Sequence, residues 1–350
     1  MNISTTDAQG LYTKMLVDVY KQKSNPTSFL RSFFPEKVTP TLELSVEVQR
    51  GFEKVATDVV RGTDGNRNQF SRSTEKVFVP PYYREWMDAT QLSLYDRLYG
   101  ATSVSDAVFV SYINSVADAL MEMQSKIERA QEVQCAQVLT TGIVTYGGAN
   151  ANMKIDFKRK AGSLIDGGSA TYFAANNDPF AEFEKGCTFL RQVGKASGGT
   201  FNAILGSTAL TNLLANTKFQ SRQNLFNMAL DNVVAPQRNA VGQAFHGIIT
   251  AGAYKVQLWS YPQYYDNASG VQTSYIDPKQ VILIPEAPKF VFAYAATPQL
   301  ITPQSTPVMG KFTINQYIDQ RGKANIIDVE SAGLAIPTAV DTIYTFKAVA

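Results

Sequence analysis

The sequence contains one histidine, His246, and two cysteines, Cys135 and Cys187, among its 350 residues. A Ser-His-Asp or Cys-His catalytic site would have to use that single histidine, and no G-x-S-x-G nucleophile elbow occurs. The two cysteines lack the paired spacing of a zinc site and are too few for a disulfide framework. These shortages argue against the common hydrolase classes and against a metal centre, and they favour a reducing compartment.

A phosphate-binding loop and a paired-carboxylate site are also missing. The glycine-rich stretches at 146–148 and 197–199 are not followed by the Lys-Ser or Lys-Thr of a phosphate loop, so we interpret them as turns. The carboxylates are scattered, and a lone histidine beside an apolar strand is typically structural. We therefore expect that the protein is not an enzyme and that it uses no cofactor and no metal.

No apolar run is long enough to cross a membrane, because the most apolar region, 281–296, is interrupted by two prolines, a glutamate and a lysine. The first ten residues show neither a cationic start nor an apolar core, so we expect no secretory signal. The formal net charge of +2 argues against a dedicated nucleic-acid binder, although weak contact stays open. We expect an intracellular protein with no membrane partner, whose 45% hydrophobic content is enough for a core.

A strict alternation of apolar and polar residues over 42–49, Leu-Glu-Leu-Ser-Val-Glu-Val-Gln, predicts a strand with one apolar face. A turn-rich, charged tip over 61–69 and a return strand near 75–79, stopped by Pro80 and Pro81, extend this strand into a long hairpin. A two-stranded hairpin is only marginally stable in water. It must therefore lie on its own domain or on an adjacent subunit.

The charged side chains of this hairpin have two interpretations. They are either the surface of a solvated loop or partners for ion pairs between subunits, and the length of the flanking strands favours the second. Exposed ion pairs are worth roughly 0–1 kcal/mol each, so repeated copies would set register and salt dependence more than stability. The candidate contact residues are Arg50, Lys54, Arg61, Asp64, Arg67, Arg72 and Lys76.

An uninterrupted helix is predicted over residues 105–141, because apolar or small residues recur there at alternating spacings of three and four. At 1.5 Å per residue it would span roughly 55 Å, which is longer than a small domain is wide. Its opposite face is polar and either solvated or turned toward another subunit. The stripe includes Tyr112, Val116, Leu120, Met123 and Ile127.

The rest of the chain predicts an arm, a second lobe and a closing strand. Residues 1–38 form the arm, and its aromatic cluster at 29–34 needs a surface to dock on, either its own domain or a neighbour. Helices and strands between 173 and 296 predict an α+β lobe with a central sheet. We expect the closing strand, 341–347, to return to the lobe that holds the long helix.

This order of parts resembles the HK97-like fold of tailed-bacteriophage major capsid proteins, and more narrowly the lambda major head protein (E-type) family. The residues that carry the resemblance are Val-Phe-Val-Pro-Pro-Tyr at 77–82, Glu-Ser-Ala-Gly-Leu-Ala-Ile-Pro at 330–337, and the closing strand. The resemblance implies an α+β chain with four regions. These are an N-arm (1–38), an E-loop (39–100), a peripheral domain with a spine helix at about 105–141 (101–172 and 297–350), and an inserted axial domain (173–296).

The resemblance also implies a function. The protein would assemble as hexamers and pentamers into an icosahedral shell around double-stranded DNA, in the virion and, during assembly, in the host cytoplasm. Its partners would be copies of itself, a portal protein, a scaffolding protein, packaged DNA through weak non-specific contact, and in some capsids a decoration protein. Scaffolding would be a separate protein or a segment removed before residue 1. Two alternatives stay open: an encapsulin-type nanocompartment shell, and an enzyme with an atypical site.

Overall fold

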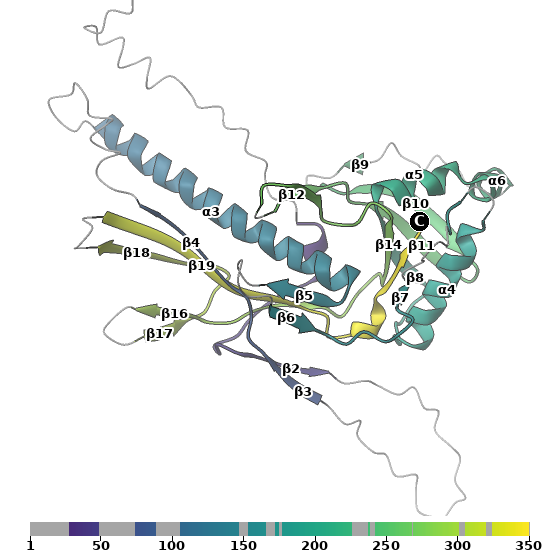
Figure 1. Ribbon diagram of the computed structural model, residues 1–350, viewed down its shortest axis with the longest axis horizontal. Coiled ribbons are helices and arrows are strands. Elements are labelled where there is room, and N and C mark those ends of the chain that lie inside the picture. Colours follow the sequence, from purple (N-terminus) through teal and green to yellow (C-terminus); the bar gives the residue numbers. More distant parts are fainter. Residues whose placement is uncertain are drawn as a thin grey trace, which may run out of the picture.

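The computed structural model combines a long helix and two mixed sheets in an α+β arrangement (Figure 1). One sheet lies along the helix, and the other forms a lobe beyond its C-terminal end. The residues that the structure describes are 28–48, 74–88, 106–146, 153–165, 172–174, 177–225, 237–238, 242–267, 269–300, 305–319 and 324–349.

Helix α3, Asp106–Thr140, matches the predicted long helix to one residue at each end. Within the predicted stripe, Met123 and Ile127 are buried, while Leu120 is partly buried against them. Val116 is half-buried, and only the helical position of Tyr112 is described. After residue 130 the buried set widens to Gln131, Glu132, Gln134, Cys135, Val138 and Leu139.

The first sheet is organised around β19, Ala324–Ile336, whose thirteen residues contact three other strands. Antiparallel partners lie on both sides of its first half, and a third antiparallel strand pairs with its end. The N-terminal segment adds a parallel edge strand. The partners are β18 (Thr313–Asp319), β4 (Tyr82–Asp88), β15 (Val291–Tyr294) and, beyond β15, β1 (Glu36–Val38), which follows the 3-10 helix η1 (Leu30–Phe33).

The second sheet has the order β7-β20-β14-β8-β11-β10-β9 and carries three helices. Aromatic side chains from helix and sheet, including Phe183, Phe201 and Phe346, fill one core between them. The strands are β7 (Leu164–Ile165), β8 (Thr200–Leu205), β9 (Gln237–Arg238), β10 (Ala244–Ala251), β11 (Tyr254–Ser260), β14 (Gln280–Pro285) and β20 (Tyr344–Lys347), and the helices are α4 (Pro179–Gln192), α5 (Ser207–Ala215) and α6 (Thr217–Leu225).

The closing strand differs from the prediction. We expected residues 341–347 to return to the lobe of the long helix, but β20 pairs with β14 and β7 in the second sheet. Tyr344 and Phe346 are both fully buried in the core of that sheet, which is the physical reason for the placement. The short 3-10 helix η3, Val340–Thr342, leads into the strand.

Four two-stranded ribbons complete the described part of the chain. The predicted hairpin appears as β2 (Leu44–Val48) and β3 (Thr74–Phe78), but the chain then continues into β4, which we did not predict. Pro80 and Pro81 separate β3 from β4 instead of ending the strand region. The other ribbons are β5 (Ile143–Tyr146) with β6 (Met153–Asp156), β12 (Tyr264–Asp266) with β13 (Gln272–Ser274), and β16 (Thr297–Leu300) with β17 (Ser305–Val308).

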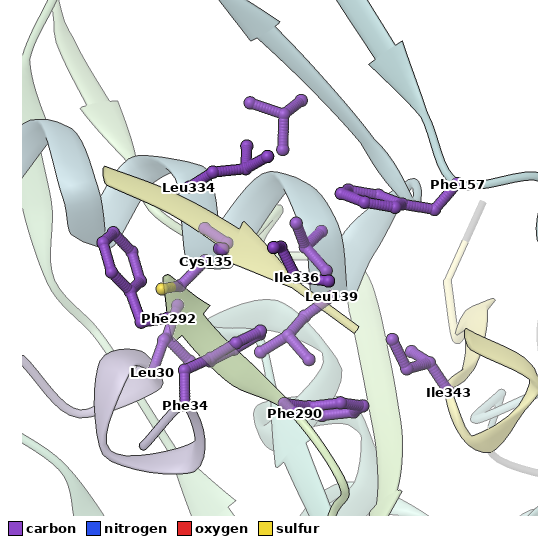
Figure 2. Close-up of a cluster of buried hydrophobic side chains, with 14 of the residues drawn as sticks. Leu30, Phe34, Cys135, Leu139, Phe157, Phe290, Phe292, Leu334, Ile336 and Ile343 are labelled. Atoms are coloured by element: carbon purple, nitrogen blue, oxygen red, sulfur yellow. The ribbon is translucent and has the colours of Figure 1, made fainter. Parts of the chain in front are cut away.

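A large core joins the N-terminal segment, α3 and the first sheet, as Figure 2 shows. Leu30 and Phe34 enter it from the N-terminal segment, Cys135 and Leu139 from α3, and Phe292 from β15. The aromatic cluster at 29–34 therefore docks on its own chain. Cys135 lies in this core and Cys187 in the core of the second sheet, and both cysteines are free.

We predict that Gly206→Ala destabilises the second lobe by about 1–3 kcal/mol, because there is no space for a larger residue. A Cβ at Gly206 would lie 2.3 Å from the carbonyl oxygen of Asp277 and 2.4 Å from that of Pro278, and backbone cannot move aside as a flexible side chain can. Gly199→Ala is the matched control, because nothing lies within 4 Å of a Cβ there. Thermal unfolding of both variants measures the difference, and equal midpoints would contradict the packing described.

Candidate functional site

Most of the predicted contact residues of the hairpin are not placed. Arg50, Lys54, Arg61, Asp64, Arg67 and Arg72 lie outside the described residues. Of the last candidate, Lys76, only the backbone is described, in β3 opposite Val46. The contact role of all seven residues therefore stays a prediction.

The base of the hairpin is fixed to the body of the protein. Leu44 is buried in the large core, and the ring of Phe78, directly opposite in the register, lies 5.6 Å from the ring of Phe157. The hydroxyl of Tyr146 donates a hydrogen bond of 3.1 Å to the carbonyl oxygen of Val79. These contacts are at the Leu44–Phe78 end, so the Val48–Thr74 end is directed away from them (Figure 1).

Large apolar side chains are exposed just beyond this base. Val77 and Val79 are 57% and 60% exposed, and Tyr82 and Trp86 of β4 are 47% and 63% exposed. Tyr82 and Trp86 lie on the same exposed face of β4, and exposed apolar surface of this kind is typical of contacts with another protein. We define Val77, Val79, Tyr82 and Trp86 as the strand surface, a candidate site of contact with a second protein.

The N-terminal segment is held to α3 by a buried carboxylate, that of Glu132. Its Oε1 accepts hydrogen bonds from the backbone N–H of Leu30 (2.8 Å) and the hydroxyl of Tyr261 (2.9 Å), and its Oε2 accepts one from the N–H of Arg31 (3.0 Å). Burial raises the pKa of Glu132 to about 7, while these donors and the nearby Arg31 charge act in the opposite direction. One side chain thus joins the arm, the helix and the end of β11.

Arg31 adds a second set of contacts to this junction. Its guanidinium donates to the side chains of Gln131, Glu36 and Tyr294, and it lies 4.5 Å from the ring centroid of Phe292. A planar cation can use its edge for hydrogen bonds and its face for an aromatic ring at the same time. The arm is therefore attached by charge and by packing together.

The C-terminal end of α3 is capped by a second, half-buried cation, Arg159. The guanidinium of Arg159 donates to the carbonyl oxygens of Thr140 (3.0 Å) and Ile343 (3.0 Å), and to the hydroxyl of Thr345 (3.1 Å). Burial lowers its pKa to about 10. Gly142 has a positive φ of 73° and leaves room for this side chain, since a Cβ there would lie 2.3 Å from Arg159 Cδ. Arg159 therefore links the helix end to the second sheet.

The predicted structural role of His246 agrees with its surroundings. Its Nε2 lies 2.7 Å from Ser260 Oγ on the neighbouring strand, and burial lowers its pKa. Among the described residues, no group of three or more His, Cys, Asp or Glu side chains could hold a metal ion. Within the same residues, no helix has the length and apolar character needed to cross a membrane.

A groove of about 690 Å³ lies between α3 and the β12–β13 ribbon. Its lining is both polar and apolar, with Lys126 and Arg129 from the helix and Tyr264 and Asn267 from the ribbon side. Lys126 also forms an ion pair of 3.5 Å with Glu85 of β4. On the helix side, the groove is lined by Lys126 and Arg129 of the predicted polar face together with Ala130 and Val133, which belong to the predicted apolar stripe.

Sequence reasoning did not identify Arg31, Glu132 or Arg159. Two of them do leave a signal. Arg31 is the one charge within the aromatic cluster Phe-Leu-Arg-Ser-Phe-Phe, and Glu132 is the one charge in the last eleven residues of the helix, 130–140. Arg159 lies in the charged run Lys-Arg-Lys and cannot be separated from its neighbours without the fold.

The sequence model of the family described as phage major capsid protein E matches residues 13–348. Among solved structures, a protein assigned as the capsid protein of a prophage in Escherichia coli CFT073 is 14% identical, with a TM-score of 0.63 and all of both chains covered. A phage-related protein from Bordetella bronchiseptica RB50 is 12% identical, with a TM-score of 0.49 over 97% of this chain and 96% of that one. No curated protein matches the chain. The first structural match shows that the fold is the expected HK97-like α+β fold.

We predict that Glu132→Gln weakens folding by about 1–3 kcal/mol, because an amide nitrogen replaces one of the two acceptor oxygens and meets a backbone donor. The raised pKa adds a pH signature. The folded state binds the extra proton between pH 4.5 and 7, so this carboxyl contributes stability below pH 4.5 that is lost as the pH rises through 7.

Denaturant unfolding of wild type and variant across pH 4.5 to 8 tests both statements. The wild-type free energy of unfolding should fall with rising pH relative to that of the variant, by on the order of 3 kcal/mol across the range. Parallel curves for the two proteins would mean that Glu132 is not the titrating group.

We predict that Arg159→Lys destabilises the protein by about 2 kcal/mol although the charge is kept, because one ammonium cannot reach acceptors both at the end of α3 and at Ile343 and Thr345. Arg222→Lys is the control, since Arg222 is exposed and its ion pair with Asp178 should be worth at most about 1 kcal/mol. Chemical unfolding compares the two variants, and a larger loss at the exposed site would contradict the capping role.

Proposed function

The chain belongs to the phage major capsid protein E family, and we propose that its copies build a shell through the hairpin and the strand surface. It is a phage major capsid protein, a structural protein whose activity is assembly into an oligomeric shell. The finer proposal is an icosahedral shell of hexamers and pentamers around double-stranded DNA. The protein would have no enzymatic activity.

One observation supports the hairpin as the assembly device. Its base is fixed by Leu44 and Phe78, while its other end is directed away from the body and leads into residues 49–73. A ribbon of two strands gains little stability by itself, so a second surface must support what extends beyond the base. In a shell, that surface is a neighbouring copy.

The four regions of the fold take these roles in the proposal. The N-arm would be residues 1–38, the E-loop 39–100, the peripheral domain 101–172 with 297–350, and the axial domain 173–296. Because β20, Tyr344–Lys347, pairs with β14, the last strand of the chain lies in the sheet of the proposed axial domain, so the peripheral assignment of 297–350 would apply only up to residue 343. The axial domains would meet around the centre of each hexamer or pentamer.

The proposed partners follow from the same reasoning. A portal protein would occupy one vertex, a scaffolding protein would guide closure, and a decoration protein is a further candidate. Packaged DNA would touch the inner surface weakly and without sequence preference, in line with the near-neutral net charge. Assembly would take place in the host cytoplasm, and the product would be the capsid of the virion.

Electron microscopy of the protein expressed alone and freed of nucleic acid tests the assembly proposal. Closed shells, or rings of five and six copies, are the expected result. A monomer that stays single in the presence of the phage's scaffolding protein would contradict it. A broad hydrolase and cofactor screen of the unassembled chain tests the proposed absence of enzymatic activity, and turnover that depends on His246 would contradict that part.

We predict that Arg61→Glu combined with Arg67→Glu leaves the subunit folded but abolishes shell formation at physiological salt, because the hairpin tip would then repel an acidic partner surface. Arg61→Lys with Arg67→Lys is the matched control, since it keeps both charges and should retain most of the particle yield. Sedimentation measures the yield, and far-ultraviolet circular dichroism checks the fold. Normal shells from the glutamate variant would show that the tip is a solvated loop.

A further inference from the structure

Two buried carboxylates lie on the face of the first sheet that is directed away from α3. Asp328 and Glu330 are 0% and 4% exposed, yet Asp328 Oδ1 and Glu330 Oε2 have no hydrogen-bond partner among the described residues. Val329, between them, points to the opposite face and packs with Met123 and Ile127 of α3. A buried oxygen without a donor costs roughly 1–3 kcal/mol, and the subunit bears that cost at both of these oxygens.

One cation serves both groups. Arg84 pairs with Asp328 through Nε at 2.8 Å and through Nη2, and the same Nε lies 3.3 Å from Glu330 Oε1. Two carboxylates against one guanidinium leave one negative charge unbalanced. The Arg84 side chain is 46% exposed, so the cover of the pair is itself open to solvent and to an incoming group.

Exposed aromatic side chains border this pair. Trp86 and Asn315 lie opposite Asp328 in the two neighbouring strands, while Tyr317, opposite Ile326, and Tyr82, opposite Ala332, lie on the same face on either side of the pair. Trp86, Tyr82 and Tyr317 are 63%, 47% and 43% exposed. Buried carboxylates with exposed aromatic rings beside them suit a guanidinium, because this group binds carboxylates along its edge and stacks on aromatic rings with its face.

We propose that Asp328 and Glu330 form the receptor for an arginine from residues 49–73 of a second copy of this chain. The proposal rests on the proposed function, in which the hairpin lies on a neighbour, and it names the site that receives it. The segment carries five cations against three acids, so its sign complements the unbalanced pair. The candidate arginines are Arg50, Arg61, Arg67 and Arg72.

The direction of the hairpin points to a second copy as the source. Residues 49–73 continue from the Val48–Thr74 end, which the register places farthest from the anchored Leu44–Phe78 pair. Figure 1 shows β2 and β3 running away from the end of the sheet where β18 and β19 meet their turn. The described part of the hairpin is therefore directed away from the carboxylate pair of its own chain, which favours an adjacent copy as the source of the arginine.

Double-mutant cycles on assembly test the pairing. Glu330→Gln, which is isosteric, should raise about tenfold the subunit concentration at which half of the protein is in particles. Each candidate arginine is changed to glutamine in the wild-type and in the Glu330→Gln background. For the arginine that binds the pair, the double variant should show the same tenfold change, whereas independent sites would multiply to about a hundredfold.

Multiplicative effects for all four arginines would overturn the proposal. Unfolding of the unassembled subunit shows whether the Glu330→Gln variant folds. The arginine variants change the other partner of the contact and do not depend on that variant. If Glu330→Gln does not fold, Asp328→Asn replaces it in the same cycle.

Disulfide trapping between two variants tests whether the arginine comes from a second copy of the chain. Tyr317→Cys in one preparation is mixed with Arg50→Cys, Arg61→Cys, Arg67→Cys or Arg72→Cys in another, and the native cysteines, both buried, do not interfere. Covalent heterodimers on oxidation are the expected result. Bond formation only when both new cysteines are in one chain would overturn the second-copy source, as would trapping by a different protein in place of a copy.

Different results would refute the receptor site and the proposed capsid function. Wild-type shells with unaffected Glu330→Gln assembly and no trapped heterodimer would refute the receptor while leaving the capsid function intact. A wild-type subunit that never assembles, even with its scaffolding protein, would refute the assembly proposal itself.

Discussion

The buried carboxylate of Glu132 is the contact on which the arrangement of the lobes depends. Its two oxygens receive hydrogen bonds from Leu30, Arg31 and Tyr261, which are about a hundred residues or more away from it in sequence. A buried charge is tolerated only when it is paired or fully hydrogen-bonded, so the arm, the helix and β11 must all be in place before this group is stabilised. Leaving the carboxylate unpaired is costly, so the junction is cooperative: the loss of one donor destabilises the contacts that the other donors make.

A second constraint acts at the C-terminal end of α3, two turns beyond Glu132. Arg159 satisfies carbonyl groups that the end of any helix leaves without partners, and it does so with donors that also reach β20. The last third of α3 is therefore fixed to both sheets, while the hairpin is anchored only at Leu44 and Phe78. A rigid body with one projecting ribbon suits a subunit that must keep its own fold while contacts with its neighbours change during assembly.

The sequence predicted the parts that depend on local periodicity. The alternation at 44–48 and the spacing of apolar residues along 106–140 reappear as β2 and α3, because a strand and a helix impose those repeats on their own neighbours. The partner of a strand is not encoded locally, and so the pairing of β20 with β14 and the existence of β4 were missed. The polar junctions at Glu132 and Arg159 were missed for the same reason, since their donors and acceptors come from distant segments. The hairpin contacts were predicted from charge alone and stay predictions.

The contrast between two acidic groups carries the functional argument further. Glu132 is buried and has three donors, so its charge is satisfied within one chain. Asp328 and Glu330 are equally buried but share one half-exposed arginine, and each keeps one oxygen without a donor in the part of the chain described. A stable monomer gains nothing from such a deficit, since apolar residues of similar volume would pack at less cost. Such a deficit suits a subunit whose final state is an assembly, because a neighbour could supply the donor that the described part of its own chain does not supply to these oxygens.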